Sequence, residues 1–189
     1  MAKPSRSSRN LTYVALLRGI NVGGHKIIKM DQLRKAFEAI GLQDVKTYVQ
    51  SGNLVFKAPP QTREALCRRL EKEILAEFRM SVPVIVRTAE EIAKTLQSNP
   101  FLQEKGIDTS KLHVTFLSRL PEQAAVRTLD AIASAPDRFQ CLGQEIYLCC
   151  PNGFGGTKLS INVFERLLSV GATTRNWNTL TRLHQMSLL

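Results

Sequence analysis

Apolar and polar positions in the first half of the chain alternate in short runs that predict strands and amphipathic helices. The run at 12–19 predicts a strand, and residues 30–41 predict a helix with Asp31 as N-cap and Gly41 at its end. Further elements are predicted as strands at 45–49 and 53–58, a helix at 62–79 and a strand at 82–87. The order β-α-β-β-α-β is that of the ferredoxin-like split βαβ arrangement.

The second half of the chain predicts the same order of elements again. A linking helix at 89–97 is followed by predicted strands at 112–118, 138–143, 145–150 and 171–175, with helices at 121–134 and 158–169 and a terminal helix. We therefore expect an α+β fold with two ferredoxin-like halves. The expected divisions are a disordered basic tail at 1–11, the first half at 12–88, and the linking helix, second half and C-terminal helix at 89–189. No obvious residue-level repeat accompanies this order of elements.

The expected strand order, 4-1-3-2 in each half, places loops that are distant in sequence at one sheet edge. In the first half, the loop after the first strand should lie beside the turn at 50–53. In the second half, the loop at 151–158 should lie beside residues 173–179.

The charge balance favours anionic partners. The 189 residues include 26 Lys and Arg against 16 Asp and Glu, a formal charge of +10. Such an excess attracts nucleic acid or phosphorylated ligands, although a solvated, solubilising surface is an equal alternative.

The sequence also favours a cytoplasmic location with no membrane partner. No apolar run is long enough to span a bilayer, and the first ten residues lack the apolar core of a secretory signal. The four cysteines show no CxxC spacing, so we expect free, mostly buried thiols and neither a zinc site nor a disulfide framework.

The loop after the first strand is rich in glycine and in hydrogen-bond donors. Gly19, Gly23 and Gly24 allow positive φ or a close approach of the backbone to a ligand. The donors around them are Arg18, Asn21, His25, Lys26 and Lys29. This composition is typical of an anion cradle, although neither GxGxxG nor GxxxxGK[ST] is present. The alternative is a tight connection whose glycines serve turns and whose Arg18 bonds carbonyl groups.

Two stretches of the second half offer related chemistry. The loop at 153–158 contains three glycines and leads into a helix, which favours either a phosphate seat or a flexible loop with Thr157 as N-cap. Near the C-terminus, Arg175 could bind an oxyanion bidentately and Trp177 could stack on a ring. The alternative there is a core tryptophan beside a capping network that includes Asn176 or Thr174.

Catalytic patterns are weak in this sequence. His25, His113 and His184 are far apart, and His113 lies in an apolar strand, so neither a triad nor a metal site stands out. No pair of acidic residues suggests hydrolysis. The sequence therefore assigns no catalytic residue, metal or cofactor.

Three stretches, residues 13–42, 45–56 and 172–180, resemble the domain-of-unknown-function family 1697 of small bacterial proteins. The resemblance extends from Thr12 to Leu183 and implies an α+β fold with two ferredoxin-like halves, but no reaction. The residues that match the motifs are Arg18, Gly19, Asn21, Gly23, Gly24, Ser51, Gly52, Asn53, Thr174, Arg175, Asn176 and Trp177.

Taken with the charge, these motifs predict a protein that binds an anionic ligand, either a phosphorylated small molecule or nucleic acid. The residues predicted to bind it are Arg18, Asn21, Gly23, Gly24, Lys26, Ser51, Asn53, Arg175, Asn176 and Trp177. One alternative is an enzyme that uses the same cleft by positioning and electrostatics, with His25 as the only obvious base. The other is a structural or interaction protein whose motifs only hold two lobes together. The sequence predicts no oligomeric state.

Overall fold

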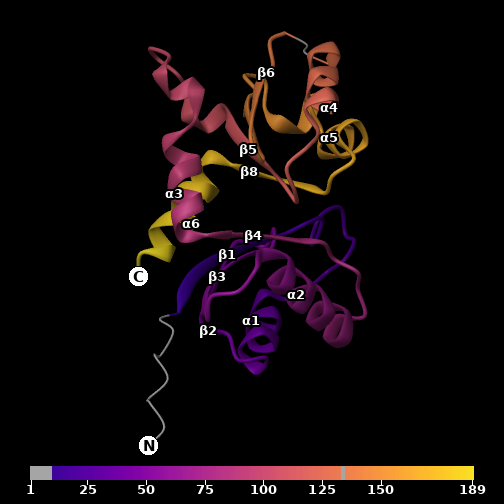
Figure 1. Ribbon diagram of the computed structural model, residues 1–189, viewed down its shortest axis with the longest axis vertical. Coiled ribbons are helices and arrows are strands. Elements are labelled where there is room, and N and C mark those ends of the chain that lie inside the picture. The colour runs from indigo at the N-terminus through magenta and orange to yellow at the C-terminus, as the bar shows by residue number, and fades with distance from the viewer. Residues whose placement is uncertain (1–9, 133–134) are drawn as a thin grey trace, which may run out of the picture. The chain divides into compact units, whose positions relative to one another are not determined.

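The computed structural model describes residues 10–132 and 135–189, which form two four-stranded antiparallel sheets with helices (Figure 1). The predicted tail at 1–11 lies outside the described residues except for Asn10 and Leu11, and Leu11 already belongs to the first strand. The described chain divides into two compact units. The first comprises the residues up to Ala89 together with Ser187–Leu189, and the second comprises Glu90–Met186.

The first unit has the predicted β-α-β-β-α-β order. Its elements are β1 (Leu11–Leu17), α1 (Met30–Ala39), β2 (Gln43–Tyr48), β3 (Asn53–Ala58), α2 (Arg63–Phe78) and β4 (Val84–Thr88). The strands lie in the order β2-β3-β1-β4, with both helices on one face of the sheet (Figure 1). The expected topology of this half is confirmed.

The second half repeats the arrangement. Its elements are α3 (Ala89–Gln97), β5 (Leu112–Leu117), α4 (Gln123–Arg127), β6 (Arg138–Leu142), β7 (Glu145–Cys149), α5 (Ile161–Leu168), β8 (Ala172–Asn176) and α6 (Trp177–Ser187). The strand order β6-β7-β5-β8 matches that of the first sheet, so the duplicated ferredoxin-like fold is confirmed. None of the helices in the described part of the chain is long and apolar enough to cross a membrane.

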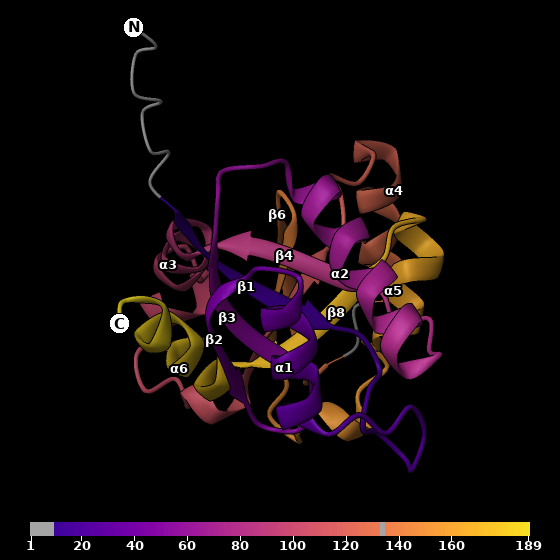
Figure 2. The same ribbon diagram turned by 90° about the horizontal axis from the view of Figure 1, so that it is seen from below.

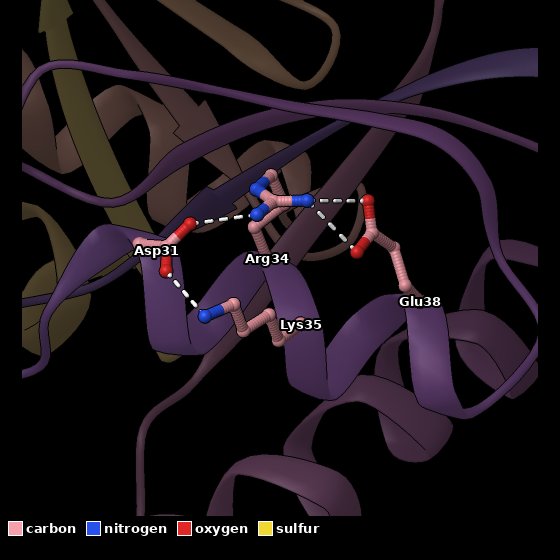
Figure 3. Close-up of polar contacts among 4 residues, drawn as sticks. All are labelled: Asp31, Arg34, Lys35 and Glu38. Carbon is pink, nitrogen blue, oxygen red and sulfur yellow. Dashed lines mark hydrogen bonds and ion pairs between the residues drawn. The ribbon is translucent and has the colours of Figure 1, made fainter.

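Helix α1 differs from its prediction at the N-terminus. Its N-cap is Lys29, which makes no side-chain cap, and Asp31 lies within the first turn instead. There the Asp31 carboxylate pairs with Arg34 at 2.7 Å and Lys35 at 2.9 Å, while Arg34 also pairs with Glu38 at 2.8 Å (Figure 3). Bases three and four residues later therefore bind the carboxylate that was predicted to cap the helix.

The helices of the second half are shorter than predicted. Helix α5 begins at Ile161, with Ser160 as N-cap, because the Thr157 hydroxyl accepts a hydrogen bond from the Leu159 amide (3.1 Å) in a separate turn before the helix. Helix α4 gives way to a 3₁₀ turn over Thr128–Ile132, and its predicted end at residue 134 lies outside the described residues.

Each unit buries one face of its sheet under its own helices. In the first unit, Tyr13 stacks on Phe56 with ring centroids 5.9 Å apart, and both pack with Phe37 of α1 and Leu70 of α2. In the second, the core centres on Phe164 of α5. A fully buried side chain of this size contributes about 1.5–3 kcal/mol to the free energy of folding.

The two halves also repeat individual contacts that the sequence does not reveal. Strands β1 and β5 end opposite Val84 and Ala172, which fixes these two residues as equivalent positions. The backbone amide of Val84 donates to the Glu71 carboxylate, and that of Ala172 donates to the Glu165 carboxylate, each at 2.9 Å. Each final strand is therefore held at its start by a carboxylate from the helix that precedes it.

Candidate functional site

The loop between β1 and α1 folds into a short β-hairpin, which we call the finger (residues 21–26). Val22 and His25 form an isolated β-bridge, and the His25 amide donates to the Val22 carbonyl at 3.1 Å. Gly23 and Gly24 between them have φ of 59° and 77°, as a tight type I′ turn requires. In Figure 2 this indigo segment extends away from the sheet of the first unit. The glycines therefore serve a turn and present its tip to solvent.

Asn21 fastens the finger to the sheet. Its side-chain amide donates to the Ile28 carbonyl at 2.9 Å and the Gln50 carbonyl at 2.7 Å, and its Oδ1 accepts from the Ile28 amide at 2.8 Å. The bond to Gln50 confirms that the loop after β1 and the turn at 50–53 are neighbours. Both amide hydrogens of Asn21 are engaged within the fold, so its predicted role as a ligand donor stays a prediction.

The turn between β2 and β3 is built from buried polar contacts. Asn53 is 0% exposed and donates to the Tyr48 carbonyl and the Ser51 hydroxyl, each at 3.0 Å. Gly52 has φ of 77°, and a Cβ there would lie 2.7 Å from the Leu17 Cβ. These contacts fix the turn against β1, while Ser51 itself stays exposed.

Lys26 links the finger to the segment that precedes β4. Its Nζ donates to the Ser81 carbonyl at 2.7 Å, and the amide of Arg18 donates to the Pro83 carbonyl at 2.9 Å. Ser81 and Pro83 also line a groove of about 360 Å³, which we call the α2 groove. Its full lining is Arg68, Glu71, Lys72, Leu75, Ser81, Val82 and Pro83. Lys26 therefore binds a residue that lines the α2 groove, and helix α2 supplies the groove with two further cations, Arg68 and Lys72.

Several groups of the finger region remain available to a ligand. The amides of Gly23 and Gly24 donate to no acceptor within residues 10–132 and 135–189, and both glycines are exposed. His25 and Lys29 are exposed as well. Of the predicted donors in this loop, His25, Lys26 and Lys29 are exposed, whereas Arg18 and Asn21 are half-buried.

In the second unit, Arg175 lies in the interior. It is 7% exposed, and its Nη1 donates to the Thr173 hydroxyl and the Thr174 carbonyl, each at 2.8 Å. Burial lowers the pKa of this guanidinium to about 10, which still leaves it charged at pH 7. These donors stabilise β8, and the predicted bidentate role toward an oxyanion stays a prediction.

The two residues after Arg175 begin helix α6. Asn176 accepts a hydrogen bond from the Thr179 amide at 2.8 Å through its Oδ1, as an N-cap does. Trp177 is 9% exposed and packs in the interior. Both placements correspond to the structural alternative that the sequence left open.

Sequence reasoning missed a second buried arginine. Arg87 on β4 pairs with Val14 of β1, as Arg175 pairs with Val114 of β5, and it is 2% exposed. Its Nη1 donates to the carbonyl of the preceding residue, Val86, at 3.1 Å, which repeats the bond of Arg175. Aligning the two final strands on their arginines would have found it, but the apolar run around Arg87 gave no signal of function.

The second glycine loop meets the C-terminal motif at one edge of the second sheet, as predicted. The Phe154 ring stacks on His113 with centroids 4.9 Å apart, and His113 pairs in register with Asn176. Burial lowers the pKa of His113, so its neutral form is favoured near pH 7.

The cysteines are free thiols, and burial affects three of them. Cys149 and Cys150 are buried, and all four cysteines are free. Burial raises the pKa of Cys150 to about 11 and also raises the pKa values of Cys67 and Cys141, which disfavours their thiolate forms. In the part of the chain that the structure describes, no three His, Cys, Asp or Glu side chains gather as a metal site.

These features define a duplicated α+β protein with the ferredoxin-like topology in each half. The sequence profile of the proteins of unknown function DUF1697 matches residues 11–147, and the chain belongs to that family. The motif at 172–180 lies beyond the matched range, so the family match rests on the first unit and more than half of the second.

A likeness to a solved structure supports the same fold. The chain is similar to the conserved bacterial protein SP0830 from Streptococcus pneumoniae, with 22% identity and a TM-score of 0.76 over 95% of this chain and 99% of that chain. No curated protein sequence matches. At this level of identity the likeness extends to the fold and carries no activity with it.

Proposed function

We propose that the protein binds an anionic, phosphate-bearing ligand at the edge of the first unit formed by the finger and the α2 groove. The observation that supports the proposal most directly is the finger itself. Its tip exposes the amides of Gly23 and Gly24, and Lys26 and Lys29 follow within a few residues. Backbone amides and ammonium groups together form the donor set that phosphate oxygens accept.

The distribution of charge along the chain supports placing the ligand on the first unit. Residues 1–89 contain 16 Lys and Arg against 7 Asp and Glu, whereas residues 90–189 contain 10 against 9. The excess positive charge of the protein is therefore concentrated in the first half. An anion that diffuses toward the protein is attracted to this half first.

For the C-terminal motif, a structural role is the second candidate. Arg175 donates to two oxygens of its own strand, Asn176 caps α6, and Trp177 is buried. In this proposal Arg175, Asn176 and Trp177 stabilise the second half and do not touch the ligand.

No observation favours a particular reaction, so we propose binding without catalysis. Four free cysteines fit the reducing cytoplasm, where we place the protein.

The test is a thermal-shift titration of the full chain with inorganic pyrophosphate, ADP and a short DNA duplex. A ligand that binds only the folded state raises the melting temperature with concentration. We expect a shift with at least one probe, and a smaller shift for Lys29→Ala. The matched control is Lys105→Ala, which removes one exposed positive charge from the second unit. No shift with any probe, or equal losses for the two variants, would contradict the proposal.

A further inference from the structure

We infer that the ligand is the phosphate backbone of a nucleic acid duplex, and that the α2 groove and the finger grip it together. This inference rests on the proposed function and names its ligand class. It adds Arg68 and Lys72, which no sequence motif pointed to.

The walls of the α2 groove carry cations that the fold leaves available. Arg68 and Lys72 lie one helical turn apart on α2 and are exposed. Neither forms an ion pair with any residue from 10 to 132 or from 135 to 189. Lys26 reaches the opposite wall through its bond to the Ser81 carbonyl. An ammonium has three donors, so Lys26 keeps two for a ligand.

The one carboxylate of the α2 groove is directed into the fold. Glu71 is half-buried and accepts the Val84 amide at 2.9 Å. Counted with Lys26, which binds the lining residue Ser81, the groove has three associated cations and one anion. Its remaining lining is the apolar Leu75, Val82 and Pro83 together with the hydroxyl of Ser81, so no further charge competes for the ligand.

The exposure of these cations favours a polyanion over a small phosphorylated molecule. An exposed ion pair changes a binding constant by at most about fivefold, so three of them cannot hold a single phosphate tightly. A nucleic acid contacts many cations at once and gains additional affinity from the release of its counterions. The open groove and the projecting finger suit such an extended ligand.

The absence of a stacking surface favours a duplex over a single strand. Proteins that bind single strands stack bases on exposed aromatic rings. The aromatic side chains that the structure describes are all buried or half-buried, and the exposed large apolar residues are Leu, Val and Ile. A duplex keeps its bases paired and presents only backbone, which cations and backbone amides can bind.

The second unit provides an internal comparison. Its groove beside Ser169, the residue equivalent to Ser81, has Arg119 and Glu122 as its charged lining. The Arg119 guanidinium donates to the Ser169 carbonyl at 2.8 Å, as Lys26 does to Ser81. Both grooves therefore share this hydrogen bond, but among the described lining residues of the two grooves the pair of unengaged cations belongs to α2. We infer that only the first unit's groove binds the duplex.

The test is fluorescence anisotropy with a labelled DNA duplex of about 24 base pairs, measured between about 50 and 200 mM salt. We expect the double variant Arg68→Ala/Lys72→Ala to weaken binding about tenfold at low salt and to reduce the slope of log affinity against log salt by about 1.8. The matched control, Lys105→Ala/Arg127→Ala, removes two exposed charges from the second unit and should change affinity less than about twofold.

Each outcome decides between the inference and the proposed function. Equal losses for the two double variants, or tighter binding of a single strand of the same sequence, would overturn the inference. If the duplex does not bind while pyrophosphate still raises the melting temperature, the inference fails and the proposed function stands. If neither probe binds, both fail. Circular dichroism of each variant separates lost binding from lost folding.

Discussion

The two halves of this protein share the hydrogen bonds that hold their final strands and differ in their surfaces. Both contain a buried arginine that donates to the carbonyl before it on the final strand, and both direct a helix carboxylate to the first amide of that strand. Outside these contacts they diverge. Helix α2 has 16 residues and unengaged cations, whereas α5 has 8 residues and the second half is nearly neutral.

This difference separates what the fold requires from what it leaves free. Contacts that occur in both halves satisfy backbone groups that every such sheet must satisfy, so they are evidence of architecture. Features found in one half alone, such as the finger and the cations of the α2 groove, are not needed to build the sheet. They are therefore the better candidates for function.

The largest effect is expected from removing either buried arginine. Arg87→Ala and Arg175→Ala each leave a cavity and unsatisfied carbonyl oxygens, and each should lower the free energy of unfolding by about 2–4 kcal/mol. Urea denaturation measures the loss. The exposed Arg166→Ala should change stability by less than about 0.5 kcal/mol. If only one of the two variants loses much unfolding free energy, the two arginines occupy equivalent positions in their sheets but do not contribute equally to stability.

The next effect concerns the turn between β2 and β3, where Gly52 is crowded against Leu17 and Ile20. An Ala Cβ at Gly52 would lie 2.7 Å from Leu17 Cβ and 2.8 Å from Ile20 Cδ1, at φ of 77°. Gly52→Ala should cost about 2–3 kcal/mol in thermal or urea unfolding. Gly106→Ala is the matched control, because Gly106 has the same φ and no atom within 4 Å of the added Cβ. Equal costs would mean that backbone strain, not crowding, sets the penalty.

A smaller loss of stability is expected from removing the carboxylate that holds the final strand in each half. Glu71→Ala and Glu165→Ala each deprive a strand amide of its acceptor and should cost about 1–2 kcal/mol by urea denaturation. The Gln variants keep an acceptor oxygen and should recover most of the loss. Glu77→Ala, on the exposed face of α2, should be nearly neutral. If the Gln variants lose as much unfolding free energy as the Ala variants, the charge of the carboxylate and not its hydrogen bond stabilises the strand.

The smallest effect is the pH dependence that His113 of the second half contributes. Burial lowers the pKa of His113 below its ordinary value of 6.5, so the unfolded state takes up the proton first as the pH falls. The contribution of the neutral His113 to stability is therefore present above pH 6.5 and is lost as the pH falls below 6.5. His113→Phe retains a ring to stack on Phe154 and should flatten this decline, measured by urea unfolding at several pH values. An unchanged decline would exclude His113 as its source.

The order and topology of the elements could be predicted because their signals are local. Helix α2 was predicted within one residue at each end, since Thr62 accepts the Ala65 amide and Arg79 closes the helix in the left-handed region. The start of α1 was not predicted correctly. Asp31 has two bases within four residues, and its carboxylate pairs with them instead of capping the helix. A capping residue and an ion-pairing residue look the same in sequence.

The candidate site could be predicted only in part. The finger and the turn at 50–53 were correctly placed together, since antiparallel topology dictates that edge. The partners of Asn21 and Lys26 could not be foreseen, because the Gln50 and Ser81 carbonyls lie 29 and 55 residues away. A donor-rich loop has the same composition whether its donors hold a ligand or the chain itself. Arg68 and Lys72 gave no signal, since alternating charges are ordinary on a helix surface.

The most direct test of the contrast between the halves is an amide NMR titration of the protein with the DNA duplex. The account predicts that amide chemical shifts change at Gly23, Gly24 and residues 68–72, 81 and 82, and that these changes shrink as salt is raised. Residues 119, 120, 122–125 and 168–170, which lie at the corresponding groove of the second unit, should not respond. Changes centred on those residues, or spread evenly over both units, would contradict it.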